Sequence, residues 1–61
     1  MTANELKRWL ARQGCSFEVG RGKGGHILVR LGERWSTLPM HGKRDLPGWL
    51  VVAIKRQLGL D

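Results

Sequence analysis

The chain has 61 residues, which is enough for one small domain with a thin core. Eleven lysines and arginines against five acidic residues give a formal charge of +6 at pH 7, which favours a polyanionic partner such as RNA, DNA, a membrane surface or an acidic protein. No apolar run reaches the ~18 residues of a transmembrane helix, and the lone Cys15 excludes an internal disulfide and a four-ligand zinc site of the usual kind. We therefore expect a single domain over residues 1–61 in a reducing cytoplasm, without a metal, a small-molecule cofactor or a membrane segment.

The first predicted element is a helix over residues 3–13. Thr2 and Glu5 have the spacing of a capping box, in which a hydroxyl and a carboxylate satisfy free amides of the first turn. Gly14 follows as the expected helix terminator. One apolar stripe with helical spacing lies between these two signals, and it consists of Leu6, Trp9 and Leu10.

Three strands are predicted next, because apolar and polar residues alternate over residues 15–19, 26–31 and 34–40. Gly32 and Glu33 form a two-residue hairpin turn between the second and third strands. In these two strands the side chains expected to face the core are Ile27, Val29, Leu31, Ser36, Leu38 and Met40. Those expected to face outward are His26, Leu28, Arg30, Trp35 and Thr37.

A second helix closes the chain, with an apolar stripe that starts at Leu46 and includes Trp49. Asp45 is expected to cap this helix and Pro47 to lie in its first turn. Trp49, like Trp9 on the first stripe, is expected in the core. The resulting fold class is α+β with the order α-β-β-β-α, a three-stranded antiparallel sheet with both helices on one face. This is the topology of double-stranded-RNA-binding domains, which by itself carries no function.

The candidate site centres on the histidine that follows a basic, glycine-rich loop. Residues 20–25 are four glycines and two cations, and they lead directly into His26. RNA cleavage by internal transesterification needs a base for the ribose 2′-hydroxyl, an acid for the leaving 5′ oxygen and positive charge near the phosphate, and an imidazole can serve as base or acid. The alternative is a surface histidine and a plain hairpin loop. The cations and histidine expected to contact RNA phosphate are Arg21, Lys23, Arg30, His41, Lys43 and Arg44.

Two further residues have competing interpretations. The outward-facing Trp35 could stack on a base or cover apolar surface on a partner protein, and the second interpretation is preferred. Cys15 is interpreted as a packing residue, because no motif that would lower its pKa surrounds it in the sequence.

The chain resembles the HicA-type (YcfA-like) toxins of bacterial type II toxin–antitoxin systems. The similarity covers nearly the whole chain and lies in the opening helix from Leu6 to Gly14, the glycine-rich run into His26, the segment Leu38–Gly42 and the closing helix from Leu46 to Leu60. The resemblance implies a ribosome-independent mRNA interferase that needs no metal and has a double-stranded-RNA-binding-like fold. It also implies a HicB-type antitoxin that binds the toxin and covers its catalytic histidine.

The family's catalytic histidine lies in a Gly-Ser-His-type motif that falls here on His26. The resemblance therefore implies His26 as the base, and we expect Lys23 or Arg30 to stabilise the phosphorane. The sequence departs from the pattern at Gly25, where a serine often precedes the histidine, and at Ile27, where many members carry a second histidine or an aromatic residue, so the general acid is unassigned. Two alternatives stay open: a non-catalytic RNA-binding module on the same fold, and a small protein whose basic face binds an acidic partner.

Overall fold

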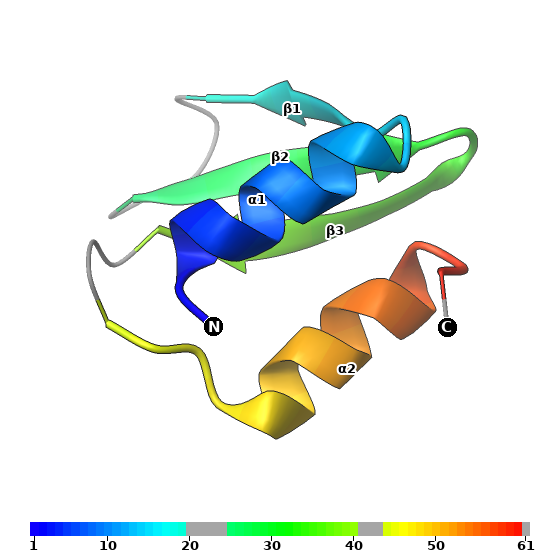
Figure 1. Ribbon diagram of the computed structural model, residues 1–61. Coiled ribbons are helices and arrows are strands. Elements are labelled where there is room, and N and C mark those ends of the chain that lie inside the picture. The colour runs from blue at the N-terminus through cyan, green and yellow to red at the C-terminus, as the bar shows by residue number, and fades with distance from the viewer. Residues whose placement is uncertain (20–24, 41–43, 61) are drawn as a thin grey trace.

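A computed structural model describes residues 1–19, 25–40 and 44–60. In chain order its elements are α1 (Ala3–Arg12), β1 (Ser16–Glu18), β2 (His26–Leu31), β3 (Arg34–Pro39) and α2 (Gly48–Gln57). The strands form one antiparallel sheet in the order β1-β2-β3, and both helices pack on the same face of it (Figure 1). The predicted fold class is confirmed. Neither of the two described helices is long and apolar enough to cross a membrane.

Hydrogen bonds typical of helix ends are present at the start of α1, as predicted, and after the end of α2. At the start of α1, the Glu5 amide donates to Thr2 Oγ1 (3.2 Å) and the Thr2 amide donates to Glu5 Oε1 (2.8 Å). Hydrogen bonding to the carboxyl, first by the Thr2 amide and then by the Thr2 hydroxyl, lowers the pKa of Glu5, so this stabilisation is present above the carboxyl's unfolded pKa and is lost as the pH falls through the folded one. After α2, the Gly59 and Leu60 amides donate to the carbonyls of Arg56 and Lys55, with Gly59 at φ 76°, which is a Schellman motif.

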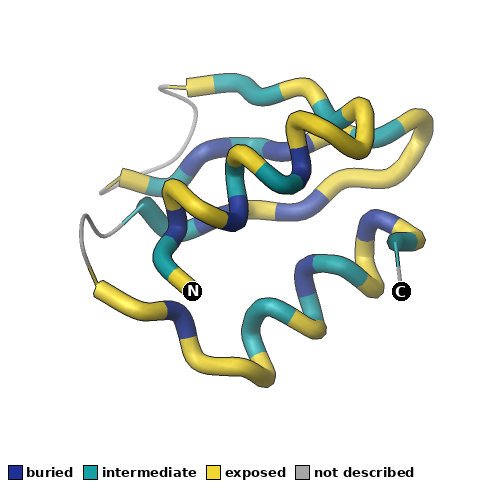
Figure 2. Tube along the Cα trace, viewed as in Figure 1, coloured by how far each residue is buried: buried dark blue, intermediate teal, exposed yellow. Residues whose placement is uncertain are grey.

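The inner face of the sheet and the two helices share one core (Figure 2). Ser36 is buried among apolar side chains, and its hydroxyl donates to the Thr37 carbonyl (3.3 Å). Arg30, Trp35 and Thr37, on the opposite face, are exposed, so the predicted alternation of the strands is confirmed. The buried apolar residues are Ala3, Leu6, Leu10, Ile27, Val29, Leu38, Leu46, Ile54 and Leu58.

The start of α2 differs from the prediction, because Pro47 rather than Asp45 is its N-cap and no side chain caps it. A proline disfavours helical backbone at the residue before it, so Leu46 is not helical and Asp45 does not cap the helix. The connector instead runs extended against the first residues of the chain. Asp45 forms an antiparallel bridge with Thr2, and the Leu46 amide donates to the Met1 carbonyl (2.7 Å).

The prediction that Trp49 lies in the core is wrong, since 72% of this residue is exposed. Trp49 precedes the buried Leu58 by nine residues, about two and a half helical turns, so the two side chains project from opposite sides of α2. The apolar run from Trp49 to Ile54 encircles the helix, and only one side of it can meet the sheet. Trp9 does pack against the core, and Lys55 Nζ lies 4.5 Å from the centroid of its ring.

Gly25 sets the start of β2 and therefore the position of His26. Its carbonyl accepts a hydrogen bond from the Met40 amide (2.8 Å), and its φ is 86°, a conformation that L side chains rarely adopt. A Cβ at this position would lie 3.3 Å from the Met40 carbonyl oxygen. The absence of a serine directly before His26 therefore has a backbone reason in this chain.

Replacing Gly25 by alanine is expected to lower the free energy of unfolding by about 1–2 kcal/mol, because the left-handed backbone would then carry a Cβ. The matched control is Gly48→Ala, at the first residue of α2, where a Cβ meets open space. That variant is expected to be neutral or more stable by up to about 1 kcal/mol. Urea unfolding measures both, and equal stability of the two variants would contradict the assignment.

Candidate active site

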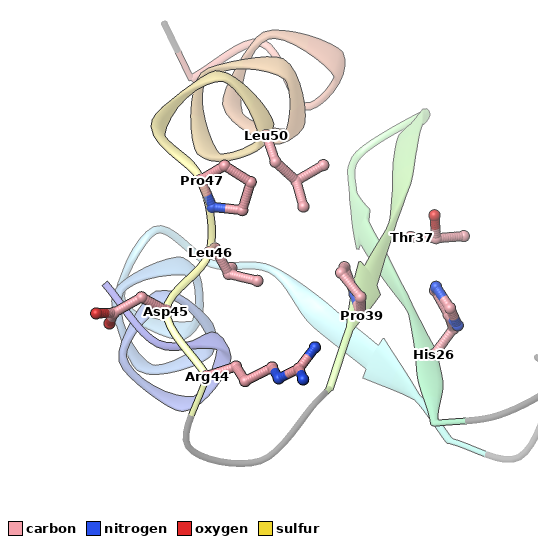
Figure 3. Close-up of a pocket in the computed structure, with 8 residues that line it drawn as sticks. All are labelled: His26, Thr37, Pro39, Arg44, Asp45, Leu46, Pro47 and Leu50. Carbon is pink, nitrogen blue, oxygen red and sulfur yellow. The ribbon is translucent and has the colours of Figure 1, made fainter.

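His26 lies on a pocket at the open edge of the sheet, where β3 is the last strand (Figure 3). The pocket has a volume of about 430 Å³ and lies between the β2–β3 hairpin and the connector that leads into α2. Its lining residues are His26, Thr37, Pro39, Arg44, Asp45, Leu46, Pro47 and Leu50.

The hairpin supplies one wall of the pocket through its register. His26 pairs with Pro39 and Leu28 pairs with Thr37, so Thr37 is the diagonal neighbour of His26 on the same face. Figure 3 shows the imidazole and the Thr37 side chain on one side of the hairpin. This side is opposite the helices, and His26 is half-buried there. The ring is thus presented to solvent by the alternation that buries Ile27.

The connector supplies the second wall. The Arg44 side chain extends toward Pro39, whereas the Asp45 carboxylate points away from the pocket (Figure 3) and lies 3.4 Å from the Met1 amino group. Leu46 is buried in the core, and the hydrogen bond from its amide to the Met1 carbonyl holds the connector in place. The backbone pairing with the first residues of the chain thus positions the guanidinium on the same pocket as the imidazole.

Among the residues predicted to form the site, His26 and Arg44 are brought to one pocket. Arg30 lies on the same face of the sheet, four residues along β2, with its Nε 3.2 Å from Glu18 Oε2. Both side chains of this ion pair are partly exposed, so it orients the guanidinium more than it stabilises the fold. The remaining predicted site residues lie outside the described part of the chain, and they are Arg21, Lys23, His41 and Lys43.

The other lining residues were not predicted to belong to the site. The hairpin turn could have predicted one wall of the pocket. A two-residue loop at Gly32 pairs Leu31 with Arg34, and counting outward from that pair places Pro39 opposite His26. The contribution of the connector had no such signal. It depends on the bridge between Thr2 and Asp45, which are far apart in the sequence, and no local pattern encodes such a pairing.

Some of the basic residues have structural roles that do not involve the pocket. Lys55 Nζ packs over the Trp9 ring, and Lys7 Nζ lies 5.4 Å from the centroid of Phe17. Cys15 packs against the core, and burial raises the pKa of its thiol, which supports its interpretation as a packing residue. Part of the +6 charge is therefore tied to the fold.

The pocket combines an imidazole, a guanidinium and a hydroxyl with an apolar wall. An imidazole can exchange a proton with a bound hydroxyl, and a guanidinium binds phosphate oxygens with charge-assisted hydrogen bonds. Pro39, Pro47 and Leu50 offer apolar surface beside these groups. Within residues 1–19, 25–40 and 44–60 no three His, Cys, Asp or Glu side chains gather as they would around a metal ion. The arrangement suits a phosphodiester with an adjacent hydroxyl.

Comparison with known proteins agrees with this chemistry. A Pseudomonas fluorescens (strain Pf0-1) protein named "Probable mRNA interferase HicA" is 38% identical over 60 residues, covering 98% of this chain and 97% of that protein. An Escherichia coli (strain K12) protein named "Probable mRNA interferase toxin HicA" is 34% identical over the full length of both. A chain in the crystal structure of the E. coli HicAB toxin–antitoxin complex superposes with a TM-score of 0.86 at 33% identity, covering 98% of this chain and 100% of that one.

The family model described as the HicA toxin of bacterial toxin–antitoxin systems matches residues 3–60. That range includes both helices, all three strands and every residue that lines the pocket. The chain therefore belongs to the HicA toxin family.

Proposed function

We propose that this chain is the toxin of a type II toxin–antitoxin system and cleaves mRNA as a ribosome-independent endoribonuclease, which inhibits translation and growth. The observation that carries the proposal is the shared pocket of His26 and Arg44, in a chain whose relatives of equal length are named mRNA interferases. The formal charge of +6 supports a polyanionic substrate.

The proposed reaction is an internal transesterification. The His26 imidazole takes the proton of a ribose 2′-hydroxyl, and the 2′ oxygen attacks the adjacent phosphorus. Arg44 stabilises the negative charge that develops on the phosphorane oxygens, and the Thr37 hydroxyl is placed to orient the ribose or the phosphate. The bond from phosphorus to the 5′ oxygen then breaks, leaving a 2′,3′-cyclic phosphate and a 5′-hydroxyl. Lys23 remains a predicted contributor to phosphorane stabilisation, and Arg30 binds the strand farther from the reacting phosphate.

The proposed partner is a HicB-type antitoxin, because the structural relative is part of the E. coli HicAB toxin–antitoxin complex. We propose that the antitoxin neutralises the toxin by covering the face that carries His26. The exposed position of this face in the isolated chain supports that arrangement. We place both proteins in the cytoplasm, where the mRNA substrate is translated.

Replacing His26 by alanine is expected to lower the rate of RNA cleavage by about 10²–10⁴-fold while the chain stays folded, because the ring lies outside the core. Gel analysis of a defined RNA measures cleavage, and circular dichroism with urea unfolding checks the fold. RNA binding without cleavage by the unaltered chain would favour the non-catalytic module. An absence of RNA affinity at physiological salt would favour an acidic protein partner.

Replacing Arg44 by glutamine is expected to slow cleavage by about 10²-fold, the typical cost of removing one group that stabilises the transition state. The matched control is Arg12→Gln in the last turn of α1, which removes the same charge from an exposed position that does not line the pocket. Single-turnover cleavage rates compare the two variants. Equal rates would mean that Arg44 acts only through overall charge.

A further inference from the structure

We propose that Trp35 is a base-stacking platform for single-stranded RNA whose reacting phosphate lies at His26. The inference rests on the proposed function for its choice of ligand and extends the substrate site along the sheet. Trp35 lies on the outer face of the sheet, and 58% of this large aromatic residue is exposed.

The outer face of the β2–β3 hairpin connects the two residues. His26 pairs with Pro39 at one end of the hairpin, and Arg30 pairs with Trp35 near the turn at the other end. Four residues of extended strand separate these pairs by about 13 Å. Because both pairs belong to the outward-facing set, their side chains share one surface, and both helices lie on the other side of the sheet.

Cationic and apolar groups border Trp35 on this surface. Arg30 is its direct cross-strand neighbour, and the Arg30 Nε lies 3.2 Å from Glu18 Oε2 on β1, the strand on the other side of β2. Leu28 lies between the two end pairs and is half-buried. An aromatic ring for a base beside a cation for the backbone is the combination that proteins use to bind single strands.

RNA explains this surface better than a protein partner does, because the surface continues into the pocket. A strand bound at His26 can continue over the outer face, because His26 and Trp35 belong to the outward-facing residues of one hairpin. Trp35 is 58% exposed, and among the described residues the cations stacked on aromatic rings lie on Trp9 and Phe17. Its large apolar ring is therefore available to a ligand.

The test measures binding of an unstructured RNA of about 10 nucleotides by fluorescence anisotropy, with the His26→Ala chain as the reference. Adding Trp35→Ala is expected to raise the Kd by about 5- to 150-fold, and Trp35→Phe should retain most of the affinity, because a smaller ring still stacks. The matched control adds Trp49→Ala, which removes an even more exposed tryptophan on α2 that does not line the pocket. This control should bind as the reference does.

The salt dependence separates stacking from electrostatics. Trp35→Ala should leave the slope of log K against log salt unchanged, whereas Arg30→Gln should reduce it by about one. Circular dichroism and urea unfolding check that each variant is folded. If Trp35→Ala does not fold, the comparison is made with Trp35→Phe.

Equal losses for the Trp35 and Trp49 variants would overturn the proposal. So would a Trp35→Ala variant that binds RNA normally but is no longer neutralised by the antitoxin, since the surface would then serve a protein. The outcome is independent of catalysis, because the reference chain lacks His26. A chain that never cleaves RNA but loses affinity with Trp35→Ala would refute the nuclease proposal and keep only the stacking role of Trp35.

Discussion

The register of the β2–β3 hairpin is the constraint on which the rest of the structure depends. Leu31 and Arg34 pair across a two-residue turn, and this pairing divides every later position between the core face and the outer face. A slip of one residue would exchange the two faces. The burial of Ile27 and Leu38 is therefore the same interaction that turns His26 outward. Fold stability and presentation of the imidazole have a common cause.

The two faces of the sheet have different electrostatic roles. On the helix side, Lys7 and Lys55 pack over aromatic rings, and their charge is part of the packing. On the outer side, Arg30 and Arg44 extend from different elements toward the surface that carries His26. The exposed ion pair of Arg30 is worth about 0–1 kcal/mol at most, so its main effect is to orient the side chain. Net charge alone would not have distinguished these roles.

Local patterns predicted most of the fold, because each element is defined by neighbours close in sequence. The capping box at Thr2 and the strand alternation both formed as expected. Two predictions about α2 were wrong. The backbone restriction before Pro47 moves the N-cap from Asp45 to Pro47. Apolar residues surround the helix on all sides, so the pattern did not show that Trp49 faces solvent.

The candidate site was predictable only in part. His26 and its outward direction followed from alternation, but the second wall of the pocket depends on the pairing of Thr2 with Asp45, two residues far apart in the sequence. Arg44 was expected to contact phosphate because of its charge and position after β3, and the structure adds that it shares the pocket with His26. The roles of Arg21, Lys23, His41 and Lys43 remain predictions from sequence.

The two edges of the sheet have a consequence for how copies of the chain behave together. β1 spans only Ser16–Glu18, and β3 begins with Arg34 and ends with Pro39, which has no amide hydrogen to donate. Short, charged or proline-terminated edges are poor templates for intermolecular strand pairing. A domain this small is thereby protected against pairing edge to edge into aggregates at high local concentration.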